Sequence, residues 1–166
     1  IPYVNARPHL GFALELVQAD VLARYHRLCG HAVRLQTGTD ENATKNVLAA
    51  RALGLSTQDL TDRHAAAFRD LGVALGISAD DFLRTTEARH RSAVHAFWGR
   101  LRPGDIYRRS YRGLYCVGCE DFVQERDLVS GRCPEHGAEP TVVAEENWFF
   151  RLSAYQRQIE ERLATG

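Results

Sequence analysis

Hydrophobic residues spaced three or four apart mark the first long element of the chain. The apolar positions with this spacing are Leu10, Leu14, Val17, Val21, Tyr25 and Leu28, and Gly30 follows them. This spacing is that of one face of an α-helix, and a glycine just past the last apolar position is typical of a helix end. The pattern therefore predicts a long helix that begins near Leu10 and stops before Gly30.

Short strands and further helices alternate after this first helix. We expect strands at 32–37 and 80–84, a helix over 43–53, a helix opened by Ser56 and Asp59, and a helix capped by Thr86. With residues 1–4 as the end of an earlier strand, this order predicts parallel strands joined by crossover helices. The expected fold class is α/β, the first half of a Rossmann-type parallel sheet with flanking helices, plus a small zinc-knuckle insertion.

The pattern changes after Asp105. Residues 106–115 are aromatic and β-like with a break at Gly113, residues 142–152 read as a strand, and Ser153 is expected to cap a helix over 154–163. Arginines among the tyrosines of 106–115 suggest either a small RNA-contacting patch or two solvated strands. We favour the solvated strands.

Three of the four cysteines form a metal-binding pattern with a histidine. The four positions form two Cys-x-x-Cys/His knuckles separated by thirteen residues: Cys116, Cys119, Cys133 and His136. Two such knuckles supply four ligands for one tetrahedral zinc ion, and a site with all four positions filled by protein is structural. Gly118 and Gly137 would allow the unusual backbone angles of the knuckles. Cys29 stands apart, and we expect it to be a small buried hydrophobic residue.

Composition narrows the class of protein only moderately. Of the 166 residues, 45% are hydrophobic and 25% are charged, which is the balance of an ordinary globular domain. Basic and acidic residues number 21 each, so a nucleic-acid partner would need a local basic patch. Without a secretory signal or a long apolar run, we expect a cytoplasmic protein.

The start of the first helix is a candidate anion site. His9 and Gly11 lie where a strand gives way to the helix, and the first amides of a helix favour a negative charge. Gly11 would let a ligand approach the backbone, and His9 could donate to a phosphate oxygen. A structural turn with a solvent-facing histidine is the alternative.

A second candidate lies after the next strand, at Asp40. Ligands of open α/β sheets bind at the carboxyl ends of the strands, and an ionised carboxylate there can accept hydrogen bonds from an ammonium group. The alternative is that Thr39 or Asp40 simply caps the following helix.

These strings resemble the signatures of one enzyme family. Residues 2–11 read Pro-Tyr-Val-Asn-x-x-Pro-His-Leu-Gly, residues 38–43 read Gly-Thr-Asp-Glu-Asn-Ala, and residues 145–152 read Glu-Glu-Asn-Trp-Phe-Phe-Arg-Leu. With the knuckles, they resemble class I aminoacyl-tRNA synthetases and, among them, the methionyl-tRNA synthetases. The leucine, isoleucine and valine enzymes share the first signature but carry a large editing domain where this chain has its knuckles.

The resemblance implies activation of methionine by ATP to methionyl-adenylate, followed by transfer to tRNA(Met). It implies ATP binding and a catalytic role for His9, ATP binding for Gly11, and methionine binding for Ile1, Tyr3 and Asp40. Mg²⁺ would accompany ATP. The knuckles would be the one-zinc form of the family's connective peptide.

The resemblance also implies a division of the chain. Residues 1–104 would be the N-terminal half of the Rossmann catalytic domain, 105–144 the zinc-binding insertion, and 145–166 the return strand and helix. Because both ends fall within expected elements and a Lys-Met-Ser-Lys-Ser loop is absent, we expect an incomplete piece of the enzyme that is inactive alone.

Two positions depart from the family pattern. Phe12 stands where the first signature has a second histidine, and Asn42 stands where the second signature has a histidine. The sequence leaves two alternatives open: a working variant of the site, or a degenerate, non-catalytic paralogue that binds a protein or RNA through its zinc module.

Overall fold

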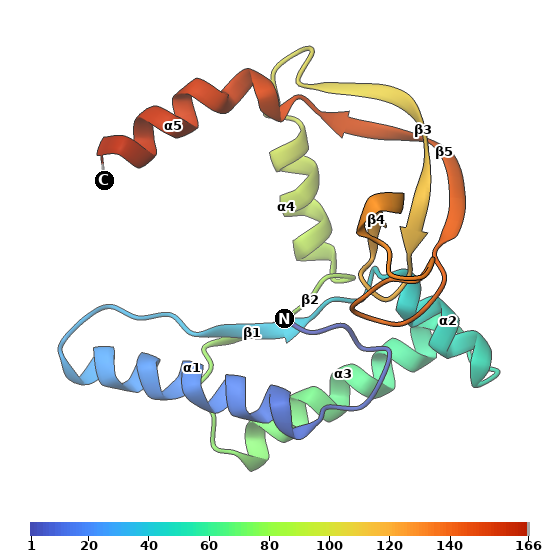
Figure 1. Cartoon of the computed structure of the whole chain (residues 1–166). Coiled ribbons are helices and arrows are strands. Elements are labelled where there is room, and N and C mark those ends of the chain that lie inside the picture. Colours follow the sequence, from blue (N-terminus) through green and yellow to red (C-terminus); the bar gives the residue numbers. More distant parts are fainter. Residues whose placement is uncertain (166) are drawn as a thin grey trace. The chain divides into compact units, whose positions relative to one another are not determined.

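The computed structural model describes residues 1–165, so Gly166, the end of the expected 145–166 segment, lies outside the described residues. The chain divides into two compact units, Ile1–Ala93 and a second one that begins at Val94. Figure 1 shows the elements of both.

The first unit is a parallel α/β arrangement. Its elements are α1 (Leu10–Leu28), β1 (Gln36–Thr39), α2 (Thr44–Ala52), α3 (Thr57–Ala74), β2 (Asp81–Arg84) and the start of α4 (Ala88–Trp98). Strands β1 and β2 pair in parallel, and Tyr3 forms a parallel bridge with Asp40 on the other side of β1. The predicted α/β class with a parallel sheet and flanking helices is therefore confirmed.

Strand β1 begins at Gln36, later than the predicted residue 32. Its partner β2 begins only at Asp81, opposite Gln36, so residues before Leu35 have no ladder to join. Where the ladder opens, the Asp80 amide donates to the Leu35 carbonyl at 2.8 Å, and the Leu35 amide donates to the Asp80 carboxylate at 2.7 Å. The parallel pairing therefore decides where the strand starts.

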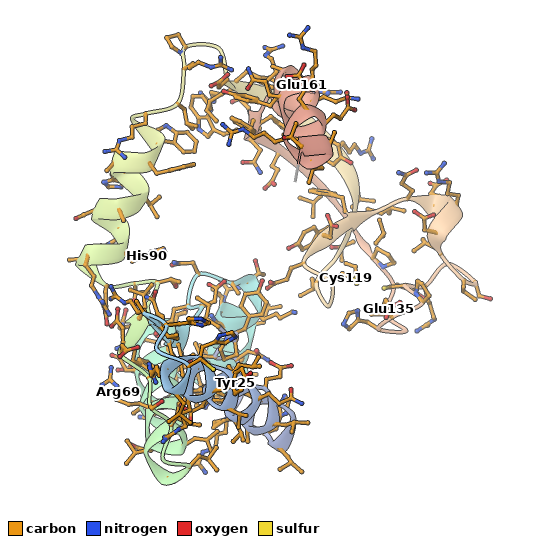
Figure 2. All side chains as sticks on the ribbon, turned by 90° about the vertical axis from the view of Figure 1, so that its left-hand side faces the viewer. Tyr25, Arg69, His90, Cys119, Glu135 and Glu161 are labelled. Carbon is orange, nitrogen blue, oxygen red and sulfur yellow. The ribbon has the colours of Figure 1, made fainter. Side chains whose placement is uncertain are left out.

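Helix α1 buries a different face from its apolar stripe. The buried residues are Leu16, Asp20 and Ala23, whereas the stripe that predicted the helix is exposed, from Leu10 (85%) to Leu28 (88%). Tyr25, labelled in Figure 2, belongs to this exposed stripe. Within residues 1–165, polar contacts hold the buried side of α1 to the loop before β2.

Asp20 is the centre of those contacts. Its carboxylate accepts hydrogen bonds from the Ser78 amide at 2.7 Å, the Ser78 hydroxyl at 2.5 Å and the Arg24 side chain at 2.6 Å. Burial alone would raise the pKa of Asp20, but the bonds from Ser78 and Arg24 outweigh it and lower the pKa to about 2. The carboxylate therefore stays ionised and fastens α1 to the loop.

Helix α3 supplies much of the first unit's core. Ser56 caps it as predicted, because the Ser56 hydroxyl accepts a hydrogen bond from the Asp59 amide at 3.0 Å. Leu60 and Phe68 are buried on its inner side. The predicted Thr86 cap is wrong: α4 begins at Ala88, and the Thr86 hydroxyl donates to the Glu41 carboxylate instead.

A three-stranded antiparallel sheet organises the second unit. Strand β3 (Ile106–Cys116) lies between β4 (Asp121–Val123) and β5 (Thr141–Phe150), and a 3-10 turn (Glu125–Asp127) follows β4. The predicted break at Gly113 is wrong, because β3 is continuous and Gly113 pairs with Val143. A Cβ at position 113 would lie 2.9 Å from the rings of Tyr111 and Phe122, so the glycine gives these aromatic rings room.

The last elements are a 3-10 turn (Leu152–Tyr155) and α5 (Gln156–Thr165). The predicted Ser153 cap is wrong, because Ser153 lies inside the turn and α5 begins three residues later. The Tyr155 hydroxyl donates to Asp105 at 2.5 Å, and its ring stacks on Phe150, which fixes the turn against the base of the sheet. None of the helices in residues 1–165 combines the length and apolarity needed to cross a membrane.

Candidate functional site

His9 forms the N-terminal cap of α1. Its Nδ1 accepts a hydrogen bond from the Gly11 amide at 3.1 Å. A Cβ at position 11 would lie 2.9 Å from the His9 ring, so Gly11 makes room for the imidazole itself. Because Nδ1 is the acceptor, the ring hydrogen sits on Nε2, and the exposed ring can donate outward at the positive end of the helix.

Asp40 lies between two chain segments at the end of β1. Its amide donates to the Pro2 carbonyl at 2.8 Å, and Asp40 bridges Tyr3 in parallel. The structure thus brings the predicted residue Tyr3 alongside Asp40, and the predicted residue Ile1 directly precedes Pro2 in the same segment. The Asp40 carboxylate accepts a hydrogen bond from the Asn42 amide at 3.3 Å, and within residues 1–165 it forms no ion pair.

Gly38 makes this arrangement of strands possible. A Cβ at position 38 would lie 1.8 Å from the Leu83 carbonyl oxygen, its neighbour on β2. Only a residue without a side chain fits there, so Gly38 sets how closely β1 and β2 approach just before Asp40.

The two positions that depart from the signatures have partners inside the first unit. The ring of Phe12 packs edge-on against Phe68 of α3, with 4.9 Å between ring centroids. The side-chain amide nitrogen of Asn42, Nδ2, donates to the Thr85 hydroxyl at 3.2 Å. Both side chains therefore take part in packing or hydrogen bonding at the edges of the candidate site.

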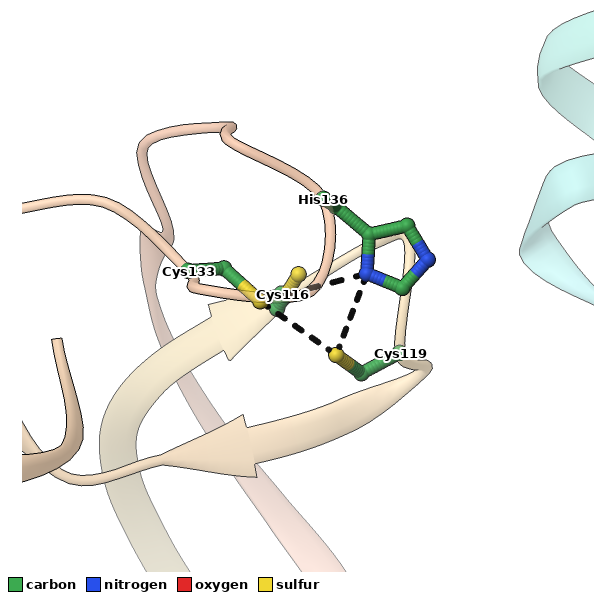
Figure 3. A group of neighbouring side chains, drawn as sticks. All are labelled: Cys116, Cys119, Cys133 and His136. Atoms are coloured by element: carbon green, nitrogen blue, oxygen red, sulfur yellow. Dashed lines mark hydrogen bonds between the residues drawn. The ribbon is translucent and has the colours of Figure 1, made fainter. Parts of the chain in front are cut away.

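The predicted metal ligands come together in the second unit. The ligand atoms of Cys116, Cys119, Cys133 and His136 all lie within 4.8 Å of one another, and their side chains converge in Figure 3. Figure 2 labels Cys119 among the surrounding side chains. The Sγ of Cys119 lies 3.5 Å from the Sγ of Cys133 and 3.3 Å from Nδ1 of His136. This cluster could hold a metal ion.

The glycines of the knuckles act in two different ways. Gly137 has φ +63°, the left-handed angle that was predicted. Gly118 does not have a positive φ; instead, a Cβ there would lie 2.4 Å from the His136 ring. Gly118 therefore lets the two knuckles close on each other.

The thiols of the cluster influence one another's protonation. Backbone hydrogen bonding from Cys119 lowers the pKa of Cys116, while the hydrogen bond to Cys133 and burial raise the pKa of Cys119 to about 12. Crowded thiols cannot all carry negative charge without a cation between them.

Cys29 does not belong to this cluster. It is exposed at the end of α1, so its predicted burial is wrong.

Two residues important to the site were given no role from the sequence. His64 is half-buried, and its Nδ1 donates to the Val4 carbonyl at 2.6 Å, which holds the segment before His9. Glu41 is buried beside Asp40 and pairs with Arg84. Their partners lie 60 and 43 residues away, so local sequence patterns cannot reveal them.

Comparison with known proteins gives consistent matches. The family described as "tRNA synthetases class I (M)" matches residues 1–141. The methionine–tRNA ligase of Thermosynechococcus vestitus is 46% identical over 165 residues, which are 98% of this chain and 31% of that protein. The methionine–tRNA ligase of a Nostoc species is 44% identical over 162 residues, 96% of this chain and 31% of that protein.

A solved structure agrees with these relatives. Mycobacterium tuberculosis methionyl-tRNA synthetase in complex with methionyl-adenylate superposes with a TM-score of 0.92 at 40% identity, over 99% of this chain and 33% of that one. The chain thus spans about a third of the length of the proteins it matches. Since the family match covers most of its residues, the chain belongs to the class I tRNA synthetases of group M.

Proposed function

We propose that this chain is part of a methionine–tRNA ligase that activates methionine with ATP and transfers it to tRNA(Met). Family membership and the names of the relatives support this proposal. The observation that carries it is the position of Asp40, a carboxylate without an ion-pair partner in residues 1–165, beside the Ile1–Tyr3 segment that leads to the His9 cap.

We assign recognition of methionine to Ile1, Tyr3 and Asp40. An ionised carboxylate only accepts hydrogen bonds, so Asp40 suits the α-ammonium group of an amino acid. Tyr3 lies across the parallel bridge from Asp40, and the Lys45 ammonium lies 4.9 Å from the centre of the Tyr3 ring. Ile1 and Tyr3 would contact the rest of the amino acid.

ATP is assigned to the start of α1. His9 would donate from Nε2 to a phosphate oxygen, and Gly11 keeps the ring in place while the helix terminus adds positive potential. When the methionine carboxylate attacks the α-phosphate, pyrophosphate leaves and negative charge grows on the phosphate oxygens. His9 would act by stabilising that charge and holding the reactants in line. Mg²⁺ would enter with ATP.

Zinc is the metal we assign to the second unit. Three sulfurs and one imidazole nitrogen are the usual donors of structural zinc, and a tetrahedral site with Zn–S bonds of about 2.3 Å has sulfurs about 3.8 Å apart. The Cys119–Cys133 sulfur distance of 3.5 Å is near that value. The zinc would hold the two knuckles, within an insertion of residues 105–144 that divides the segments 1–104 and 145–166 of the catalytic domain.

The test is amino-acid-dependent exchange of pyrophosphate into ATP, using the natural-length protein. We expect exchange with methionine and none with leucine, isoleucine or valine. Asp40→Asn should weaken methionine binding by about 30-fold or more, because the ammonium loses its charged partner. Asp70→Asn, on the exposed side of α3, is the matched control.

Two results would overturn the proposal. If folded, zinc-loaded protein supported no exchange with any amino acid, the chain would belong to a non-catalytic paralogue. Near-normal methionine binding in Asp40→Asn would remove the assignment of Asp40.

A cytoplasmic location is part of the same proposal, which localisation of the natural-length protein in cells would test.

A further inference from the structure

Glu41, directly after Asp40, is a buried carboxylate with a complete set of donors. It is 4% exposed, and its side chain is fully buried. Its two oxygens accept hydrogen bonds from Arg84 Nε at 2.6 Å, Arg84 Nη2 at 3.0 Å, the Thr39 hydroxyl at 2.8 Å and the Thr86 hydroxyl at 2.5 Å. A fork of two parallel bonds from one guanidinium fixes direction as well as distance.

The charge of Glu41 is maintained in spite of its burial. Burial alone would raise the pKa of Glu41, but the bonds from Arg84, Thr86 and Thr39 outweigh it, so the pKa is lowered. The bond to Glu41 likewise raises the pKa of Arg84, which also donates to Asp62 on α3. The three groups therefore form a charged bridge from the end of β1 through the end of β2 to α3.

The backbone around Asp40 is held by the same bridge. The Glu41 amide donates to the Thr85 hydroxyl at 2.8 Å, and the Thr85 amide donates to the Thr39 carbonyl at 3.2 Å. On the opposite side, the Asp40 amide donates to the Pro2 carbonyl. The peptide groups on both sides of Asp40 are thus held by hydrogen bonds, while within residues 1–165 its carboxylate forms no ion pair.

The adjacent carboxylates of Asp40 and Glu41 differ in their partners. Arg84 pairs with Glu41 and Asp62, and it leaves Asp40 unneutralised. Without Glu41, Arg84 would keep only its partly exposed partner Asp62 and lose its buried one. Pairing within the bridge therefore fixes the backbone from which the Asp40 carboxylate projects.

We propose that Glu41 and Arg84 are positioning residues, which act through Asp40 on recognition of the substrate's α-ammonium group. This inference rests on the assignment of Asp40 in the proposed function. Neither residue touches the substrate in this proposal. Their effect should therefore appear only for ligands that carry the ammonium group.

The experiment compares two ligands in the natural-length protein. Glu41→Gln keeps the size of the side chain but replaces an acceptor oxygen with an NH₂ group, so it cannot accept all four bonds. We expect this variant to bind methionine about 10- to 100-fold more weakly, the scale of a small misplacement of a binding group. Binding of 4-(methylthio)butanoate, which lacks the amino group, and of ATP should stay unchanged.

A double-mutant cycle tests whether the effect passes through Asp40. In Asp40→Asn, the additional Glu41→Gln change should cost almost nothing in methionine binding, because the group it positions is already neutral. Arg84→Lys keeps the charge but loses the fork, so it should behave like Glu41→Gln. Arg89→Lys removes a comparable fork, on Asp81, and should leave methionine binding unchanged.

The possible failures are distinguishable. Equal weakening of both ligands by Glu41→Gln, or additive effects in the cycle, would overturn the positioning role while leaving Asp40 in place. Normal methionine binding in Asp40→Asn would overturn the assignment of Asp40 in the proposed function itself. If Glu41→Gln fails to fold, Thr86→Ala, which removes a single donor, replaces it. Thr86→Ala should weaken binding of methionine by a smaller factor and leave binding of 4-(methylthio)butanoate unchanged. Unchanged methionine binding in both Thr86→Ala and Arg84→Lys, each shown to be folded, would overturn the inference.

Discussion

The imidazole of His9 and the amide of Gly11 are joined by a hydrogen bond of 3.1 Å, in which His9 Nδ1 is the acceptor. This bond caps α1 and assigns the ring hydrogen to Nε2, the nitrogen that remains available to a ligand. One side chain thus caps the helix and presents a ring N–H at the helix terminus.

This dual role leads to a prediction for His9. His9→Ala should slow adenylate formation by about 10²- to 10³-fold, as expected for loss of one donor to a developing negative charge, with little change in methionine affinity. Rapid-quench measurement of adenylate formation, with methionine affinity from titration, checks both. His9→Asn can still cap the helix but lacks Nε2, so it should be equally slow. A loss of methionine affinity instead would show that His9 has a different role.

Removal of a zinc ligand should unfold part of the second unit. Cys133→Ser should contain well under one zinc per chain and lose its cooperative melting transition in that unit, because structural zinc contributes on the order of 10 kcal/mol to such modules. Metal analysis and thermal melting measure the two effects. Cys29→Ser, which alters the exposed cysteine of α1, is the control and should keep one zinc. Less than half an equivalent in fresh wild-type protein would contradict the zinc assignment.

The lowered pKa of Asp20 predicts how the stability of the folded protein depends on pH. Its pKa is lowered from 3.8 to about 2 in the folded protein, so the unfolded state binds the proton more readily. The stabilisation is therefore fully present above about pH 4 and is lost as the pH falls toward 2. Asp20→Asn should lower the free energy of unfolding by about 1–3 kcal/mol at neutral pH. Urea titrations at several pH values test this; an equal loss at pH 7 and pH 2 would contradict it.

Gly38 offers a test of the strand packing. Gly38→Ala places a Cβ 1.8 Å from the Leu83 carbonyl oxygen, so β1 and β2 must separate near Asp40. We expect a large loss of stability, on the order of 3 kcal/mol or more, together with weaker methionine binding. Gly72→Ala, on a helix with open space around it, should be neutral or stabilising by up to about 1 kcal/mol. Similar melting temperatures for the two variants would refute the packing argument.

Much of the architecture could be predicted because its signals are local. The Ser56 cap, the left-handed glycines that follow helices, such as Gly30 at φ +80°, and the knuckle spacing each act within a few residues. Such features require no knowledge of the rest of the chain. They determined the order of elements, the parallel class of the first unit and the four metal-ligand positions.

The tertiary structure decided what depended on distant partners. The buried face of α1, the exposure of Cys29 and the continuity of β3 all depend on the fold, and the expectations of a buried Cys29 and a break at Gly113 were wrong. No local pattern assigned a role to Glu41, because that role depends on Arg84, 43 residues away. Sequence alone determined which groups are available for chemistry. Folding decided that the Glu41 carboxylate is paired with Arg84 and that the Asp40 carboxylate forms no ion pair within residues 1–165, because burial and pairing exist only once the strands lie side by side.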